Sequence, residues 1–495
     1  MSQERGIIYG LDDRPPFGRA LVLAAQHVLT MFGATVSMPL LFGPQMGMSQ
    51  QEIGILISSV MLCSGLATLV QTTFGSRLPI IQGVSFAFIA AFFAIIGTVK
   101  ERGGSSSEMM QYIAGAILFG AVIEIVIGFS GLMGWLRKLL SPVVVGPVIM
   151  LIGLALFQHG APKAGTDWGI SGLTIVLIIL FSLVLSRRSR IFQLFPILLA
   201  IACVVTLCWL LSAAGIYTAE DRAYVNLTTA RSSAWFRWNP ADVVLPWGMP
   251  KFEFGFAIAV LAGYLASMIE SFGDYHACSN MAGAGDPTPK QISRGIGCEG
   301  IGCLLTGLLG GFASTSYSEN IGLVGLTKVA SRYVVQIGAV MLVLLGFFGK
   351  FGALAAAIPE PVVGGLYCAL FGLISAVGVQ QLAKCDLNSD RNLFIAGFSL
   401  FMGLSVPAYF AASIEPKIPG QMLAVYRPTS AAVLQHLNSS LAGIVVAVGS
   451  TGMAVAAILG LILDNLVPGT PEQRGLAQPS LFVPAAGDVG EGQED

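Results

Sequence analysis

The sequence predicts an all-α polytopic membrane protein with about 14 transmembrane segments. The 495-residue chain is 55% hydrophobic and only 11% charged, and its mean hydropathy is +0.77. Soluble domains carry about 25% charged residues, so this composition cannot cover an aqueous surface. Apolar runs of about 17–25 residues, the length that crosses a bilayer, recur from end to end. Polar breaks divide them into segments at 18–42, 53–74, 80–98, 110–131, 141–158, 169–186, 192–216, 253–275, 295–312, 315–330, 333–357, 361–379, 392–413 and 441–464.

Fourteen segments form two sets of seven, and an odd number per half places the halves in opposite orientations. This 7+7 inverted repeat is the plan of many secondary transporters. The third segment (80–98) and the tenth (315–330) hold equivalent positions. Both begin with Gly, Ser and aromatic residues where a lipid-facing helix would carry Leu and Ile. Such a pair of interrupted segments indicates a binding site near the bilayer midplane, with non-helical backbone buried in protein or lining a cavity.

Basic residues indicate the orientation of the segments, because cytoplasmic connections are enriched in Lys and Arg. With the amino terminus inside, the even-numbered connections hold Arg77, Arg137, Lys138, Arg187, Arg188, Arg190, Lys290, Arg294, Lys328, Arg332, Lys384 and Arg391. Lys100, Arg102 and Lys163 are exceptions. We therefore expect a plasma-membrane protein with both termini cytoplasmic and the long polar stretches 217–250 and 414–440 outside.

Composition and motifs argue against several other functions. A net charge of −1 offers no basic surface for nucleic acid. The eight cysteines form neither a C-x-x-C pair nor a His/Cys metal spacing, so no zinc site or disulfide framework is indicated. We expect no cofactor and no resident metal. An intramembrane enzyme lacks support from any Ser/His pair or nucleotide loop; a non-transporting receptor is the other alternative of a different class.

Ionisable side chains inside transmembrane segments mark candidate functional positions, because each costs about 2.5–3.5 kcal/mol to insert. Glu270 and Asp274 stand four residues apart in the eighth segment and share one helix face. Glu299 lies in the ninth segment, and Glu319 opens the tenth.

Two further polar positions in the membrane are weaker candidates. His27 follows Gln26 in the first segment, a pair that is more typical of internal packing than of ligand binding. Glu124, in the fourth segment, is a further buried acid, which we interpret as structural.

Glu319 has the clearest physical role. It stands at the start of a half-helix, where unpaired backbone N–H groups and the positive end of the helix dipole stabilise a carboxylate. The same N–H groups can donate to carbonyl oxygens of a neutral ligand. A planar edge that alternates N–H and C=O would match two carboxylates and two backbone donors. Pyrimidine and purine bases have that edge.

Four motifs of the chain resemble those of the nucleobase–ascorbate transporter family. Glu319-Asn-Ile-Gly-Leu-Val-Gly-Leu-Thr-Lys is similar to the family signature, in which Gln, Glu or Pro precedes Asn-x-Gly and a later Thr. Gln26-His27 resembles the first-segment motif, and Glu270-Ser-Phe-Gly-Asp-Tyr resembles the acidic motif of the eighth segment. Pro468-Gly-Thr-Pro-Glu-Gln-Arg-Gly resembles a tail of animal members. The matches extend from residue 20 to residue 475, in the family's order.

The resemblance implies a division into core and gate domains. The core would comprise segments 1–4 and 8–11, with short crossover strands in segments 3 and 10, and the gate would comprise segments 5–7 and 12–14. These are residues 18–131 and 253–357 for the core, 141–216 and 361–464 for the gate, 217–250 for the extracytoplasmic loop, and 1–17 and 465–495 for the cytoplasmic tails. A homodimer through the gate domain is expected.

The resemblance also assigns roles to individual residues. Glu270 and Glu319 would bind a base through their carboxylates, with Asp274 beside them. Backbone groups of Phe86 and Ser318 would contact the base, and Tyr317 would pack on it or bond to it. The residues expected to support the site or the coupling of a cation are Asp274, Glu299, His27, Asn320, Ser85 and Thr327.

These residues favour an importer of nucleobases by cation symport. Ascorbate-type members carry Pro where this chain has Glu319, which argues against the alternative of an ascorbate or other organic-anion carrier. Uracil-type members place His where this chain has the purine-type Asp274, whereas many purine members carry Gln in place of Glu319. Uracil and purines such as xanthine therefore both stay open. Two ionised carboxylates on one helix face are unfavourable, which favours the proton as the co-transported cation, with sodium as the alternative.

Overall fold

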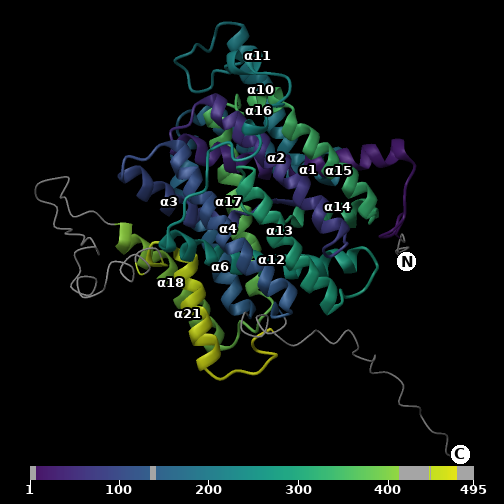
Figure 1. Cartoon of the computed structure of the whole chain (residues 1–495), viewed down its shortest axis with the longest axis vertical. Helices are drawn as coiled ribbons and strands as arrows, with labels where there is room; N and C mark the ends of the chain where they lie inside the picture. The colour runs from purple at the N-terminus through teal and green to yellow at the C-terminus, as the bar shows by residue number, and fades with distance from the viewer. Residues whose placement is uncertain (1–6, 134–140, 412–444, 446–447, 476–495) are drawn as a thin grey trace, which may run out of the picture.

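The computed structural model describes residues 7–133, 141–411, 445 and 448–475 as a bundle of helices with one small sheet (Figure 1). Within these residues, nine helices are long and apolar enough to cross a membrane. Five further segments at the predicted positions are shorter or more polar, namely α3, α13, α14, α15 and α21. The polar stretch 414–440 and the start of the segment at 441–464 lie outside the described residues. The prediction of an all-α polytopic protein is confirmed.

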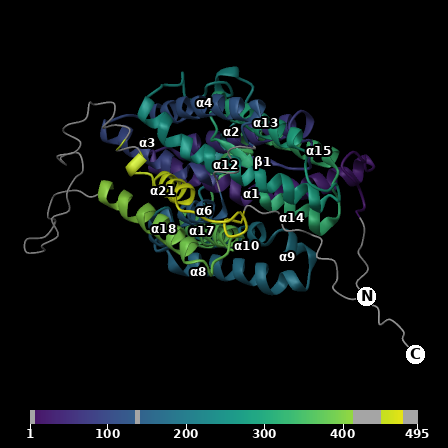
Figure 2. The same cartoon turned by 90° about the horizontal axis from the view of Figure 1, so that it is seen from below.

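One group of helices, called here the first group, forms the upper half of Figure 2. In it α13 packs on α4 and α2, and α15 packs on α2 and α1. Its helices are α1 (Phe17–Gln45), α2 (Gln50–Thr73), α3 (Ile89–Glu101), α4 (Ser106–Ser130), α12 (Phe254–Met281), α13 (Pro289–Leu308), α14 (Ser318–Thr327), α15 (Arg332–Phe347) and α16 (Gly349–Ala355), with a 3₁₀ turn η1 (Phe86–Phe88) before α3. The predicted segment 333–357 is thus broken at Phe348.

The second group lies below the first in Figure 2 and is built around α17, which packs on α6, α7 and α8. Its helices are α6 (Pro142–Ala155), α7 (Phe157–Ala164), α8 (Trp168–Ile179), α9 (Arg190–Leu194), α10 (Pro196–Ala213), α17 (Glu360–Leu382), α18 (Asp390–Ala411) and α21 (Gly452–Leu466). A π turn (Leu180–Val184) and a 3₁₀ turn (Leu185–Arg187) continue α8. The first group thus contains the third and tenth segments, and the second group lies beside them.

The connection between α10 and α12 is fastened to the first group. It contains the short helix α11 (Thr228–Ser232) and a 3₁₀ turn (Pro240–Asp242). The indole Nε1 of Trp247 donates to the carbonyl oxygen of Gly310 at 3.0 Å, and the buried guanidinium of Arg237 donates to the carbonyl oxygen of Gly346. This loop is therefore attached to the first group at both ends of the tenth and eleventh segments' helices, near Gly310 and Gly346.

Candidate functional site

The third and tenth segments meet in the sheet of the molecule. Strand β1 (Gln82–Val84) pairs antiparallel with β2 (Ser314–Ser316), with Gly83 opposite Thr315. Because η1 and α3 follow β1 directly and α14 follows β2, the two short helices leave the crossing in opposite directions with their N-termini facing it. Such paired N-termini present unpaired N–H groups and positive dipole ends to a ligand. The predicted crossover strands, and the opposite orientation of the two segments, are confirmed.

The close approach of the two crossover segments depends on Gly83. A Cβ atom at Gly83 would collide with the ring of Tyr317. The Tyr317 hydroxyl donates to the carbonyl oxygen of Val84 at 3.2 Å and lies 3.2 Å from the hydroxyl of Thr35 in α1. Tyr317 is thus a buried clamp between α1 and the crossing, and its hydroxyl is engaged with protein groups.

Replacing Gly83 by Ala is expected to destabilise the protein by about 1–3 kcal/mol, since overpacking forces neighbouring groups to shift. Gly97→Ala in α3 is the matched control, because nothing lies within 4 Å of its added Cβ. Chemical denaturation of the two purified variants measures the difference. Equal stability of Gly83→Ala and wild type would contradict the described packing.

Asp274 is held by hydroxyl groups of the tenth segment. The Ser316 hydroxyl donates to its Oδ2 at 2.9 Å, and the Ser318 hydroxyl donates to its Oδ1 at 2.8 Å. The hydroxyl of Ser271, one turn earlier in α12, lies 2.7 Å from that of Ser316. Asp274 therefore joins α12 to the junction of β2 and α14, which is a positioning role beside the expected binding residues.

Glu319, the second residue of α14, faces a cavity. Its side chain is exposed, as is Ser318, whereas Glu270 in α12 and Phe86 at the start of η1 are partly buried. The carboxylates of Glu270 and Glu319 are close enough for their charges to interact. The structure therefore brings Glu270, Glu319 and the N-termini of both short helices to one place.

The cavity at Glu319 has a volume of about 260 Å³ and lies between the two groups of helices. Thr30 of α1 and Gly322 of α14 line one side, and Ile197 of α10 and Leu370 of α17 line the other. It extends along α14 as far as Leu326. The end of α14 packs against the amino-terminal segment, because the Ile8 N–H donates to the carbonyl oxygen of Lys328 at 2.8 Å. The cavity therefore extends toward the face that carries the amino terminus.

The opposite face is closed by contacts between the two groups. The Tyr367 hydroxyl of α17 donates to the carbonyl oxygen of Ser37 in α1 at 3.1 Å. The ammonium of Lys163 in α7 lies 3.4 Å from the carbonyl oxygen of Leu40, and the His159 ring stacks on Phe93 with centroids 4.3 Å apart. These contacts bind the later half of α1, and α3, to the second group.

The supporting residues occupy different layers around the site. The Asn320 amide donates to the carbonyl oxygen of His27 at 3.0 Å and lies 3.2 Å from its Nδ1, which joins α14 to α1. Ser85 caps η1, and its N–H donates to the carbonyl oxygen of Ala313. The Thr327 hydroxyl donates to the carbonyl oxygen of Leu323 in its own helix. Thr327 lies eight residues after Glu319, about 12 Å further along α14, so its side chain does not reach Glu319.

Glu299 lies behind the crossing rather than in the cavity. Its Oε1 accepts a hydrogen bond from Ser267 at 2.9 Å, and its Oε2 accepts one from Tyr275 at 3.0 Å. The Gln71 amide of α2 donates to the Tyr275 hydroxyl at 2.6 Å. Glu299 therefore anchors α13 to α12, and through Tyr275 to α2.

Sequence reasoning missed the hydroxyl groups that orient these acids. Ser267, Ser271 and Asp274 recur at helical spacing on α12, which was a detectable signal. Ser316, the partner of Ser271 and Asp274, lies in another segment, as does Thr35, the partner of Tyr317. No local pattern predicts either pairing.

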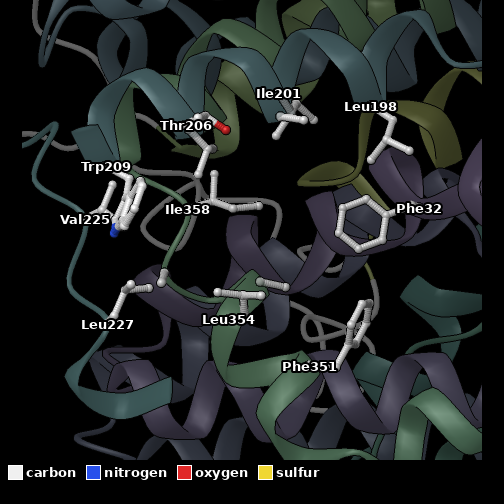
Figure 3. Close-up of a pocket in the computed structure, with 14 residues that line it drawn as sticks. Phe32, Leu198, Ile201, Thr206, Trp209, Val225, Leu227, Phe351, Leu354 and Ile358 are labelled. Atoms are coloured by element: carbon white, nitrogen blue, oxygen red, sulfur yellow. The ribbon is translucent and has the colours of Figure 1, made fainter. Parts of the chain in front are cut away.

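A larger cavity of about 360 Å³ lies between α1, α10 and α16, and Figure 3 shows Phe32, Trp209, Leu354 and Ile358 around it. Its lining is apolar apart from Thr206. A base in this cavity would leave most of its polar groups without partners, at a cost of several kcal/mol. The cavity at Glu319 is therefore the better candidate site.

Known proteins resemble this chain in sequence. A model of the Permease family matches residues 18–412. Solute carrier family 23 member 1 of Rattus norvegicus is 38% identical, covering 95% of this chain and 82% of its own. Nucleobase-ascorbate transporter 12 of Arabidopsis thaliana is 35% identical, covering 94% and 71%.

Two solved structures share the fold. The transmembrane domain of the cyanobacterial bicarbonate transporter BicA matches with a TM-score of 0.54 and 14% identity, covering 77% of this chain and 94% of that one. SLC26A9 matches with a TM-score of 0.50 and 11% identity, covering 79% and 63%. The chain thus has the 7+7 transporter fold, and its relatives are transporters rather than enzymes. With the family match over most of its length, the chain is a multi-pass membrane transporter that belongs to the nucleobase–ascorbate transporter family.

Proposed function

We propose that this transporter imports nucleobases with a lactam edge, such as uracil and xanthine, by symport with a cation across the plasma membrane. The observation that carries the proposal is the position of Glu319. Its carboxylate lines the cavity at the N-terminus of α14, beside Glu270 of α12. The two acids supply acceptors for base N–H groups, and the two helix N-termini supply donors for base carbonyl oxygens.

Glu319 at the cavity and Glu270 near it disfavour an anionic substrate. Like charges repel, and a bound ligand that displaces water strengthens the repulsion by lowering the local dielectric. The mixture of acceptors and N–H donors instead suits a neutral ring that presents both kinds of group. This supports a nucleobase over ascorbate, which is an anion at neutral pH.

In this proposal the first group acts as the core domain, residues 18–131 and 253–357, and the second as the gate, residues 141–216 and 361–464. A cavity on one face and contacts on the other correspond to one state of an alternating-access cycle. Transport then requires the contacts at Tyr367, Lys163 and His159 to open while the cavity at Glu319 closes.

Tyr367→Phe is expected to shift the protein toward the state that is open on the face opposite the amino terminus. Loss of a hydrogen bond worth about 1 kcal/mol changes a population about fivefold. A cysteine at the buried position Val36, in a background with exposed Cys203 replaced by Ser, reports this through its labelling rate with an impermeant maleimide applied to that face.

Ser171→Ala is the matched control, because the Ser171 hydroxyl bonds to Ala164 and Pro361, both in the second group. Faster labelling with Tyr367→Phe and unchanged labelling with Ser171→Ala is the expected result. Equal rates in both variants would show that the Tyr367 contact does not hold this face closed.

Uptake of labelled bases tests the proposed function. Cells that lack their own base transporters would express the chain and receive uracil, xanthine, hypoxanthine, uric acid or ascorbate, with sodium and external pH varied independently. Saturable uptake of uracil or xanthine that increases with a cation gradient is expected. Uptake of ascorbate without uptake of any base would contradict the proposal.

A further inference from the structure

One face of helix α4 packs closely against α12 and α13, and the carboxyl group of Glu124 lies in the middle of that face. Gly120, Glu124 and Gly128 follow one another at intervals of four residues and so share a face. A Cβ at Gly120 would collide with the ring of Tyr264 in α12, and a Cβ at Gly128 would collide with the backbone of Gly297 in α13. Glu124 is therefore enclosed between two close helix contacts.

Among the described residues, no hydrogen bond of good geometry reaches the Glu124 carboxyl group. Its side chain is fully buried, and neither Oε1 nor Oε2 is bonded to any group in the described part of the chain. The Cys303 thiol lies close enough to interact weakly with it, but Cys303 Sγ donates to the carbonyl oxygen of Ser314 in β2 and accepts from the Ser314 N–H. An ionised carboxylate in such a place is very costly, so these surroundings suit the neutral acid.

The groups that face Glu124 add to the cost of ionising its carboxyl group. They are Glu299 and Cys303 of α13 and Tyr264 and Tyr275 of α12, all acidic groups. Glu299 is the carboxylic acid among them, and the charges of the Glu124 and Glu299 carboxyl groups interact across the contact between α4 and α13. No cation is among these facing groups, so ionising both acids places two uncompensated charges at one helix contact.

The hydrogen bonds distinguish Glu124 from Asp274 and Glu299, two other buried acids of the first group. Both oxygens of Asp274 accept bonds from Ser316 and Ser318, and both oxygens of Glu299 accept bonds, from Ser267 and Tyr275. Acceptor bonds at both oxygens suit an ionised carboxylate, which has no proton to donate. Glu124 alone among these three is left without them.

We propose that Glu124 carries the co-transported proton, held against Glu299 behind the crossover strands. This rests on the proposed function and places the proton behind the site rather than on Glu270 or Asp274. One proton binds Glu124 from the outer side and leaves it on the inner side in each cycle. With the proton bound, Glu299 stays ionised and holds Ser267 and Tyr275, which keeps α12 and Glu270 in place for the base.

Loss of the proton couples to the site through two short routes. Repulsion between the ionised Glu124 and Glu299 acts on α12 through the Ser267 and Tyr275 bonds. It acts on β2 through Cys303, which is bonded to Ser314. Both routes end at elements that carry residues of the candidate site, so deprotonation would favour release of the base.

The test uses purified protein in proteoliposomes and compares two modes of transport. Counterflow exchanges labelled for unlabelled base and needs no net movement of protons, whereas accumulation driven by an imposed pH gradient does. Glu124→Gln mimics the protonated acid. We expect counterflow within about twofold of wild type and loss of accumulation driven by the pH gradient. Glu108→Gln, at the polar start of the same helix and paired with Lys251, is the matched control and should retain both.

If Glu124→Gln does not fold, Glu124→Leu is the second variant. It too should retain counterflow and lose accumulation driven by the pH gradient. If counterflow and accumulation fall together in both variants, Glu124 is structural and the inference is wrong. Full accumulation by Glu124→Gln, or accumulation by the wild type from a sodium gradient alone, would also overturn it. Absence of base counterflow in the wild type would instead contradict the proposed function.

Discussion

Glu270→Ala should severely weaken binding of the base rather than slow its turnover. The Glu270 carboxylate lies near that of Glu319 in the middle of α12, where water is poorly placed to substitute for it. Removing an acceptor leaves base N–H groups unpaired in a dry site, at a cost of about 1–3 kcal/mol or more for a charged partner. An affinity loss of about 5-fold to more than 100-fold is expected, measured by equilibrium binding of labelled uracil or xanthine to the purified variant.

Gly273→Ala separates this effect from general disturbance of α12. Gly273 lies three residues after Glu270 in the same helix, and nothing lies within 4 Å of a Cβ added there. This variant should keep most of the affinity. Near-normal affinity of Glu270→Ala would remove Glu270 from the binding site.

The preference for lactam bases over other bases should be larger than the loss of affinity caused by removing any single contact in the site. An edge of C=O, N–H and C=O exists in uracil and xanthine, whereas adenine lacks it and hypoxanthine and guanine keep only part of it. An ionised carboxylate accepts hydrogen bonds and donates none, so ring acceptors of adenine would face acceptors. Discrimination against an analogue that leaves buried polar groups unpaired reaches about 10⁴-fold.

Competition against labelled uracil or xanthine measures this selection. Adenine, cytosine and ascorbate should compete poorly, and unlabelled uracil and xanthine should compete well. Glu319→Gln supplies an amide donor in place of an acceptor and should weaken the preference. A ranking with adenine above both lactam bases would contradict the proposed arrangement of the site, although not the family assignment.

The fold could be predicted from the sequence because its signals are local. Hydropathy marks each segment where it stands, and Gly, Ser and aromatic residues at the start of the third and tenth segments replace the apolar residues of a plain helix. Both features depend only on neighbouring residues. The family motifs at Glu270 and Glu319 likewise indicated the acids that the structure brings together.

Contacts between distant segments could not be predicted in the same way. The bond from Ser316 to Asp274 spans 42 residues, and the contact of Thr35 with Tyr317 spans 282. Each depends on the register in which whole helices pack, which no local pattern encodes. The surroundings of Glu124 could not be predicted for the same reason. Its lack of well-formed hydrogen bonds within the described part of the chain is visible only once α4, α12 and α13 are packed together.

Counterflow by purified wild-type protein in proteoliposomes tests the central claim most directly, because it requires only binding and alternating access. Vesicles loaded with unlabelled uracil or xanthine would receive the labelled base outside. The account predicts saturable accumulation of label that excess unlabelled uracil or xanthine suppresses and ascorbate does not. Counterflow of ascorbate, with none for either base, would contradict it.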